Sequence, residues 1–285
     1  MPSQPLVPPP ALDIVNRDVE RALAEDIGSG DASADLIPED RRLQARVIAR
    51  EDAVVAGRPW FDTVFARMDP RIVIDWRVGE GERIQADQTL CTLHGPARAL
   101  LSGERSALNF LQTLSATATL TRRYVDVLDG LPTRLLDTRK TLPGLRHAQK
   151  YAVRCGGGHN HRIGLYDAIL IKENHIAAAG GITPAVNAAR ERHPGLFLEV
   201  EVETLKQLEE CLELNVSRVL LDNFDLPRLH QAVALAGGRV SLEASGGITL
   251  AHLRAVAETG VDFISIGALT KDIKAIDLSM RFIPG

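Results

Sequence analysis

The sequence has few cysteines, no long apolar run and no excess of one charge. It holds three cysteines, Cys91, Cys155 and Cys211, and no Cys-x-x-Cys pair. A disulfide framework or a structural zinc site is therefore not expected, and we predict a protein of the reducing cytoplasm. The chain also lacks the roughly 20 consecutive apolar residues of a membrane span. Its proline-rich first ten residues lack the basic start and apolar run of a signal peptide, so we expect a loose arm there.

The charges nearly balance. The 285 residues include 33 basic and 37 acidic side chains, for a formal net charge of −4. This balance argues against general nucleic-acid binding, which needs a basic face, but it permits a locally basic pocket for an anionic substrate. With 25% charged and 45% apolar residues, the composition predicts a globular protein of one large domain or two ordinary ones.

The first part of the chain mixes helix and strand. Residues 12–26 carry apolar side chains at helical spacing, and segments 44–50, 71–78 and 88–93 alternate like strands. A long, mostly apolar helix follows. We expect Ser102 to be its N-cap and Arg105 to lie in its first turn.

The second part predicts a parallel sheet covered by helices, because short apolar runs alternate with helical stretches. A full eight-stranded barrel needs two further strands, so we expect an incomplete barrel or one closed by a less obvious strand. The tail 274–283 alternates like a strand that closes the barrel or returns to the first sheet. We place the domain change near residue 115. The six runs are 133–137, 168–172, 196–202, 218–222, 239–244 and 262–266.

Glycines follow the last two predicted strands. Ser245-Gly246-Gly247 ends one run and Ile266-Gly267-Ala268 ends the next. Glycine lets backbone amides approach a phosphate closely, and the final loops of such barrels often bind one. The alternative is a pair of tight turns that need glycine for positive φ.

A basic cluster follows the first two strands. Lys172 stands out because the three residues before it are apolar and should be buried. It suits a carboxylate or phosphate, or a Schiff-base nucleophile if its pKa were depressed. Arginine suits a carboxylate that accepts two parallel hydrogen bonds. The cluster consists of Arg139, Lys140, His161, Arg162 and Lys172.

An acidic pair ends two adjacent strands. Glu201 and Asp222 could hold Mg²⁺, bind sugar hydroxyls or stabilise a developing cation. The alternative is that they are structural partners of nearby arginines and lysines. We discount zinc at His159 and His161, because no third His or Cys ligand is spaced to join them. Gly156-Gly157-Gly158 does not match the phosphate-loop pattern GxxxxGK and is expected to be a loop.

Over nearly its whole length the chain resembles quinolinate phosphoribosyltransferase, also called carboxylating nicotinate-nucleotide pyrophosphorylase. The distinctive segments are ERSALNFLQTLSATAT (104–119), LLDTRKTLPGLRHAQKYAVRCGGGHNHRIGLYDAILIKENH (135–175), EVEVET (199–204), LLDNF (220–224), LEASGGI (242–248) and SIGALT (265–270).

The resemblance implies a Mg²⁺-dependent enzyme of NAD biosynthesis. It would convert quinolinate and 5-phosphoribosyl-1-pyrophosphate into nicotinate mononucleotide, pyrophosphate and CO₂. The implied fold is an open α/β sandwich, residues 1–115 with the returning tail 274–285, followed by an incomplete seven-stranded α/β barrel over residues 116–273. The implied assembly is a homodimer or a higher oligomer, in which Arg105 completes the partner's site.

The resemblance also implies roles for the residues above. Lys140 would face the phosphoribosyl pyrophosphate and act in catalysis with Glu201 and Asp222, which would hold the ribose hydroxyls and Mg²⁺. Quinolinate would meet Arg105, Arg139, His161, Arg162 and Lys172, and the 5-phosphate would meet Ser245, Gly246, Gly247, Gly267 and Ala268. Thr138 and Ile266 complete the substrate-binding set.

Three alternatives stay open. The chain could be a phosphoribosyltransferase of the same fold that acts on nicotinate or another aromatic acid. It could be a Schiff-base aldolase that uses Lys172. It could be a sensor that binds phosphoribosyl pyrophosphate without turnover. A product assay and borohydride trapping separate them.

Overall fold

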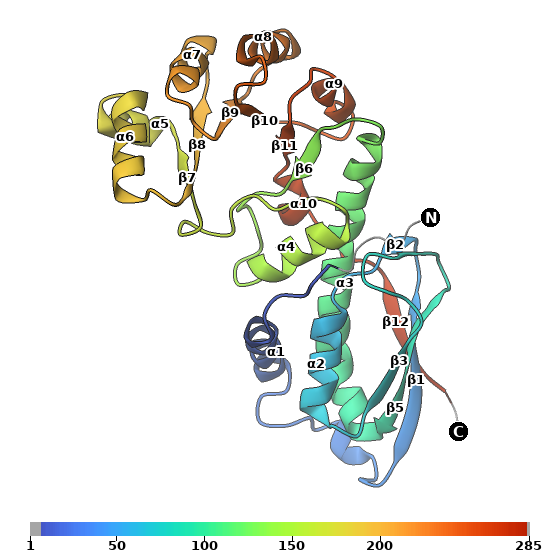
Figure 1. Cartoon of the computed structure of the whole chain (residues 1–285). Helices are drawn as coiled ribbons and strands as arrows, with labels where there is room; N and C mark the ends of the chain where they lie inside the picture. Colours follow the sequence, from blue (N-terminus) through green and yellow to red (C-terminus); the bar gives the residue numbers. More distant parts are fainter. Residues whose placement is uncertain (1–6, 284–285) are drawn as a thin grey trace. The chain divides into compact units, whose positions relative to one another are not determined.

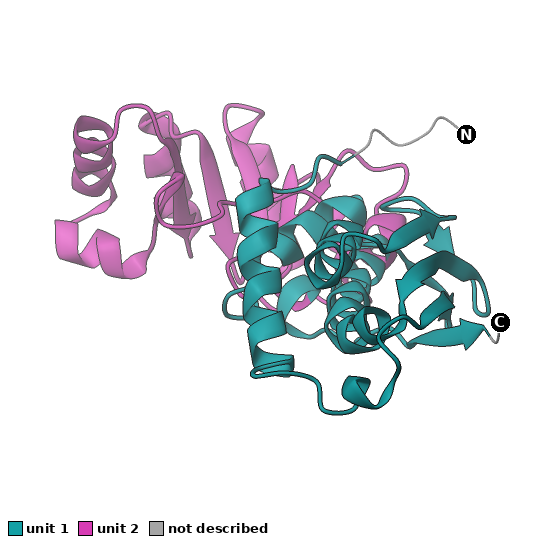
Figure 2. Ribbon diagram, turned by 90° about the horizontal axis from the view of Figure 1, so that it is seen from below, with its two compact units in different colours: residues 1–122, 141–157, 269–285 teal, residues 123–140, 158–268 magenta. Residues whose placement is uncertain are grey.

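The computed structural model describes residues 7–283. Its contacts divide the chain into two compact units (Figure 2). The domain ranges 1–115 and 116–273 stay a prediction. The arm expected over residues 1–10 lies mostly outside the described residues, and residues 7–11 form neither helix nor strand. Among the described residues, the first unit contains 7–122, 141–157 and 269–283, and the second contains 123–140 and 158–268.

The first unit is built on an antiparallel sheet with the strand order β12-β1-β5-β3 (Figure 1). The C-terminal strand β12 pairs with β1 in a register that runs from Ala49 opposite Leu278 to Gln44 opposite Ile283. Two short strands, β2 and β4, form a separate antiparallel pair. The strands are β1 (Arg42–Ala49), β2 (Ala53–Val54), β3 (Val73–Trp76), β4 (Arg83–Ile84), β5 (Thr89–Pro96) and β12 (Leu278–Ile283).

The helices of this part begin with α1, which has the predicted bounds 12–26. The N-cap expected at Ser102 is wrong: helix α3 begins at Ala97, directly after β5, and Ser102 lies inside it. The Ser102 hydroxyl instead donates a hydrogen bond to Asp31 at 2.7 Å. The helices are α1 (Leu12–Asp26), the 3₁₀ turn Ala34–Leu36, α2 (Arg58–Met68), α3 (Ala97–Val127), α4 (Arg146–Cys155) and α10 (Ala268–Lys271), of which α3 and α10 cross a boundary between the units.

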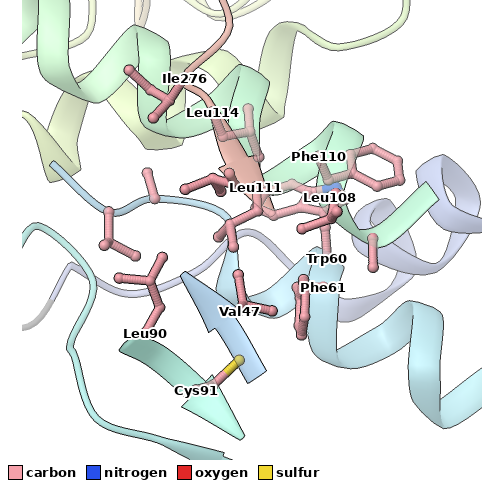
Figure 3. Close-up of a cluster of buried hydrophobic side chains, with 14 of the residues drawn as sticks. Val47, Trp60, Phe61, Leu90, Cys91, Leu108, Phe110, Leu111, Leu114 and Ile276 are labelled. Atoms are coloured by element: carbon pink, nitrogen blue, oxygen red, sulfur yellow. The ribbon is translucent and has the colours of Figure 1, made fainter. Parts of the chain in front are cut away.

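Apolar side chains fill the interior of the first unit (Figure 3). Trp60 and Phe61 of α2 and Leu111 of α3 are completely buried there. The Phe61 ring packs edge-on against Trp76 of the sheet, with centroids 5.2 Å apart. Burial of such side chains drives folding at about 1.5–3 kcal/mol each. This core fixes α2 and α3 against the sheet.

The second unit contains a parallel sheet of six strands, which confirms the six predicted apolar runs. Its order is β6-β11-β10-β9-β8-β7, so β6 and β7 are consecutive in the sequence but lie at opposite edges. At the outer edge of β6, Leu136 forms an isolated parallel bridge with His159. The strands are β6 (Arg134–Leu136), β7 (Ala168–Ile171), β8 (Phe197–Val202), β9 (Arg218–Asp222), β10 (Ser241–Ser245) and β11 (Phe263–Ser265).

Helices connect successive strands of this sheet, as expected for parallel strands. Two of them begin with side-chain caps: Thr204 accepts from the amide of Gln207, and Asp225 accepts from that of Arg228. None of the helices within residues 7–283 has both the length and the hydrophobicity of a membrane span. The helices are α5 (Glu173–Ala179), α6 (Ile182–Arg192), α7 (Leu205–Glu213), α8 (Leu226–Ala236) and α9 (Leu253–Ala257).

Candidate active site

A pocket of about 270 Å³ lies in the second unit at the carboxyl ends of the parallel strands. Strands that run in one direction deliver the residues after them to the same end of the sheet, which is where parallel α/β folds place their sites. Most of the residues expected from the sequence meet here. The lining consists of Thr138, Arg139, Lys140, His161, Arg162, Leu170, Lys172, Glu201, Leu220, Asp222, Glu243, Ser245 and Ser265.

A larger pocket, of about 340 Å³, lies in the first unit between α1, α3 and the 143–145 segment. Its ionisable lining is Asp18, Arg21, Glu25 and Asp26, so carboxylates outnumber cations. The pocket of the second unit has the reverse balance, with four Lys or Arg side chains. An anionic substrate therefore suits the second unit.

One wall of the second unit's pocket joins the predicted basic and acidic residues. Lys172, the residue after β7, donates to Glu201 of β8 at 2.6 Å. Burial raises the pKa of Glu201, and the hydrogen bond and charge of Lys172 oppose that shift. Nζ of Lys172 is therefore engaged by a carboxylate in the pocket wall. Asp222 ends the next strand, β9, beside this pair.

A buried carboxylate, that of Asp137, binds the segment 159–162 through two hydrogen bonds. Asp137, completely buried after β6, accepts from the Asn160 side chain at 2.6 Å and from the His161 amide at 2.9 Å. These bonds bring His161 and Arg162 into the pocket wall. Burial lowers the pKa of Arg162, and the charge of Arg139 lowers it further, so the two guanidinium groups lie close enough to repel each other. A bound anion would relieve that repulsion.

Two glutamates that are absent from the residue set predicted above form what we call the floor of the pocket: Glu243 lines it, and Glu199 contacts His161 of the lining. Glu199 of β8 and Glu243 of β10 are 1% and 0% exposed. Glu199 lies 2.7 Å from Nε2 of His161, and Arg218 donates to Glu243 at 3.2 Å. Burial raises the pKa of both carboxyls, that of Glu243 to about 7, and the neighbouring charge of Glu199 adds to the shift at Glu243.

A sequence signal for these two residues exists. Glu199 alternates with Glu201 on the period-2 strand β8, which places both on one face. Glu243 interrupts an apolar run that otherwise predicts a buried strand. Three further lining residues, Leu170, Leu220 and Ser265, carry no signal, because each is an ordinary strand residue.

The glycines after β10 and β11 differ in backbone conformation and in the space around them. Gly246 has φ +101°, and a side chain there would collide with Asn223, so glycine is required. Gly247 has φ +59° with open space around its α-carbon, and a Cβ on Gly267 would come within 2.9 Å of Lys140. The Ile266 amide donates to the Leu136 carbonyl at 3.0 Å and is therefore already engaged.

The remaining predicted residues lie outside the lining of this pocket. Arg105 is an exposed residue of α3 in the first unit. The predicted residues that do not line the pocket are Arg105, Gly246, Gly247, Ile266, Gly267 and Ala268.

Two sets of side chains could hold a metal ion. Glu201 and Asp222 offer carboxylate oxygens at the pocket, which suits Mg²⁺ held by one or two carboxylates and by substrate phosphates. Within residues 7–283, one group of three metal-ligating side chains has its ligand atoms within 4.8 Å of one another: His161, Glu199 and Glu243. This trio differs from the zinc site at His159 and His161 that was discounted above, because it contains two glutamates and not His159.

Comparison with known proteins gives consistent matches. The family described as quinolinate phosphoribosyl transferase matches with its N-terminal domain over residues 30–115 and its C-terminal domain over residues 117–281. The chain is 43% identical over 274 residues to a probable carboxylating nicotinate-nucleotide pyrophosphorylase of Synechocystis, covering 95% of this chain and 93% of that protein. The corresponding protein of Bacillus subtilis is 42% identical, with 90% and 89% covered.

A solved structure matches equally well. The nicotinate-nucleotide pyrophosphorylase of Francisella tularensis superimposes with a TM-score of 0.94 and 45% identity. The match covers 99% of this chain and 100% of that one.

Proposed function

Because the chain belongs to the quinolinate phosphoribosyltransferase family, we propose that it transfers a phosphoribosyl group from 5-phosphoribosyl-1-pyrophosphate to quinolinate. The products are nicotinate mononucleotide, pyrophosphate and CO₂, as part of NAD biosynthesis. The observation that carries the proposal is the single pocket in which Arg139, Arg162 and Lys172 lie beside the carboxylates Glu201 and Asp222. Cations for an acid and carboxylates for a developing cation are the two requirements of this reaction.

Quinolinate carries two adjacent carboxylates. Arg139 and Arg162 suit them because a guanidinium donates two parallel hydrogen bonds to a carboxylate. Lys172 adds a compact positive charge to the same lining, and His161 lies beside Arg162 in it. Thr138, which follows β6, also lines the pocket. A substrate with only one carboxylate would leave part of this cationic set unused.

The ribosyl donor would occupy the other side of the pocket. Lys140 would face the pyrophosphate, and Ser245, Gly246, Gly247, Gly267 and Ala268 would receive the 5-phosphate. The positive φ of Gly246 and the small space beside Gly267 are features of backbone that can approach a phosphate closely. The engaged amide of Ile266 would give that residue a supporting role in the turn rather than a phosphate contact.

Glu201 and Asp222 would bind the ribose hydroxyls and hold Mg²⁺. The ion would shield the negative charge of the departing pyrophosphate. As the bond to pyrophosphate breaks, the ribosyl carbon becomes positively charged, and the two carboxylates stabilise this charge more in the transition state than in the ground state. The pyridine nitrogen of quinolinate then attacks that carbon.

Decarboxylation follows from the new bond. Once the ring nitrogen is alkylated, the pyridinium accepts the electron pair left by the adjacent carboxylate, which departs as CO₂. A proton then replaces it on the ring carbon. No covalent enzyme intermediate is needed. The contact between Lys172 and Glu201 supports this, because Nζ of Lys172 already donates to that carboxylate at 2.6 Å. Borohydride should therefore trap no substrate on Lys172.

We extend the fold to an incomplete seven-stranded barrel. The bridge between Leu136 and His159 lies on the edge of β6 that faces away from β11. The segment around His159 would thus act as a short seventh strand beside β6. The antiparallel pairing of β12 with β1 supports a tail that belongs to the first domain.

The assembly would be a homodimer in which Arg105 enters the partner's site. Arg105→Ala and Arg139→Ala variants should each be inactive alone. Mixing them should restore part of the activity, because a mixed dimer contains one site with both arginines intact. An absence of any restoration, with subunit exchange verified, would count against a shared site.

The first test is a product assay. Purified protein is mixed with phosphoribosyl pyrophosphate, Mg²⁺ and either quinolinate or nicotinate, and nicotinate mononucleotide and CO₂ are followed. Product from quinolinate alone is the expected result. Turnover of nicotinate instead would overturn the assignment of the second carboxylate. Binding of phosphoribosyl pyrophosphate without turnover of either acid would favour a sensor.

A further inference from the structure

We propose that Glu199 is a positioning residue that holds His161 as a neutral imidazole with its hydrogen on Nε2. Through His161 it would fix the backbone of Arg162 in the substrate pocket. In this arrangement His161 brings no positive charge to the acid, and Arg139, Arg162 and Lys172 supply the charge. The inference rests on the proposed function, which it deepens.

The tautomer follows from the two partners of the ring. The amide of Arg162 donates to Nδ1 of His161 at 2.8 Å. A backbone amide can only donate, so Nδ1 must accept and carries no hydrogen. The other nitrogen, Nε2, lies 2.7 Å from Oε2 of Glu199, an acceptor that needs a donor. The hydrogen of the neutral ring is therefore on Nε2, and an imidazolium would place two donors against each other at Nδ1.

A second carboxyl faces the same nitrogen of the ring. Oε2 of Glu243 lies 3.7 Å from Nε2 of His161. Arg218 pairs with Glu243 at 3.2 Å, and its guanidinium also lies 3.9 Å from the Phe263 ring centroid. Oε1 of Glu199 and Oε1 of Glu243 are buried and accept no hydrogen bond from any described donor. Carboxyl acceptors on this side of the ring are consistent with a hydrogen on Nε2.

Both ends of the Arg162 segment are consequently fixed. Asp137 binds the amide of His161, and the His161 ring binds the amide of Arg162, so two successive backbone amides are anchored to buried side chains. The Arg162 guanidinium donates to the Ala168 carbonyl at 3.2 Å, which orients it further. Glu199 is the far end of this chain of contacts. Its loss should misplace Arg162 without touching the ribosyl donor.

The kinetic test compares substitutions of Glu199 in β8 with a matched control at Glu203, the residue after that strand. Glu199→Ala should raise the KM for quinolinate roughly 10- to 100-fold, as loss of an orienting partner does, while the KM for phosphoribosyl pyrophosphate changes little. Glu199→Gln keeps an acceptor for Nε2–H and should restore most of the affinity. Glu203→Gln, at an exposed position outside the pocket, should behave like the parent protein.

Two kinetic outcomes would overturn the proposal: equal increases in both KM values, or a Glu199→Gln variant as impaired as Glu199→Ala. Melting temperatures of all variants identify any that do not fold. The wild-type protein provides an independent test that needs no variant to be active. Its ¹⁵N-labelled imidazoles are examined by long-range ¹H–¹⁵N spectroscopy, with His161→Gln used to assign the signal.

The expected spectrum shows a neutral His161 with its hydrogen on Nε2 at about pH 7.5, above the usual range of a histidine pKa. A hydrogen on Nδ1, or an imidazolium, would reject the proposal. This measurement does not require turnover. A wild-type protein that is inactive with quinolinate but has the Nε2–H tautomer would remove the proposed function and leave the Glu199–His161 pairing intact.

Discussion

The interiors of the two units are filled with different chemistry. In the first unit, Trp60, Phe61 and Leu111 belong to a continuous apolar cluster. In the second unit, Glu199 and Glu243 of the parallel sheet are both buried and both ionisable. Both units also bury apolar side chains, and the first unit buries Lys150, so the contrast lies in the pair of buried carboxyls beside the pocket of the second unit.

The two kinds of interior contribute differently to the free energy of folding. Apolar burial stabilises a fold without specifying a ligand. Buried carboxyls cost desolvation free energy unless they are paired, and here that cost is offset by His161 and Arg218. Polar interiors of this kind are expected at sites rather than in structural cores. The comparison predicts that stability depends mainly on the first unit and activity on the second.

The largest effect on stability should come from the apolar core. Leu111→Ala removes a completely buried side chain and should lower the free energy of unfolding by about 3–5 kcal/mol. Leu36→Ala makes the same chemical change at a side chain that is 86% exposed and should cost less than about 0.5 kcal/mol. Urea denaturation of both variants measures the contrast. Similar losses at the two positions would break the comparison.

The second effect concerns activity. Lys172→Met keeps much of the side-chain volume but removes the cation beside Glu201. We expect kcat/KM for quinolinate to fall by about 10²–10³, while the melting temperature changes little because the lysine side chain is 42% exposed. Lys206→Met, on the exposed side of α7, is the matched control. A variant that loses stability and keeps activity would reverse the assignment of the two units.

The third effect is the pH dependence of the free energy of unfolding, which a buried ionisable group changes and apolar packing does not. The pKa of Glu243 is raised to about 7 in the folded protein, so between its ordinary range and pH 7 the folded state binds more protons than the unfolded state. This group therefore stabilises the fold at low pH, and that contribution is lost as pH rises through about 7.

Glu243→Gln removes this dependence. The wild-type free energy of unfolding should decline relative to that of the variant by about 1–3 kcal/mol between about pH 5 and pH 8. Urea denaturation at both pH values gives the difference. Parallel pH profiles for the two proteins would show that Glu243 does not bind a proton in the fold.

The sequence predicts those features that local pattern determines. The six parallel strands and helix 12–26 follow from hydrophobic periodicity. Nine of the predicted residues line one pocket, seven of them because they end a strand or follow one, whereas His161 and Arg162 lie between α4 and β7. The predicted start of α3 is wrong. Ser102 has the chemistry of an N-cap, but the helix begins earlier, at Ala97, directly after β5.

The floor of the pocket was harder to predict. Glu243 lies within an apolar run, and its partner Arg218 comes from a strand that is separate in the sequence. Such pairs depend on the strand order, which periodicity does not encode. The proposed tautomer of His161 depends on where the fold places the amide of the next residue, Arg162, and residue spacing does not determine that position.

The smallest expected effect tests whether an ion pair of the second unit must be buried to affect the free energy of unfolding. Arg254 and Glu258 form an ion pair of 2.9 Å on the surface of α9, where both side chains are about half exposed. Glu258→Gln should cost less than about 0.5 kcal/mol, and added salt should abolish the difference, because solvent screens exposed pairs. The bond from Arg254 to the Val127 carbonyl stays intact in this variant. A loss above about 1 kcal/mol in urea denaturation would mean that surface charge also stabilises this unit, and the contrast with the buried Arg218–Glu243 pair would then disappear.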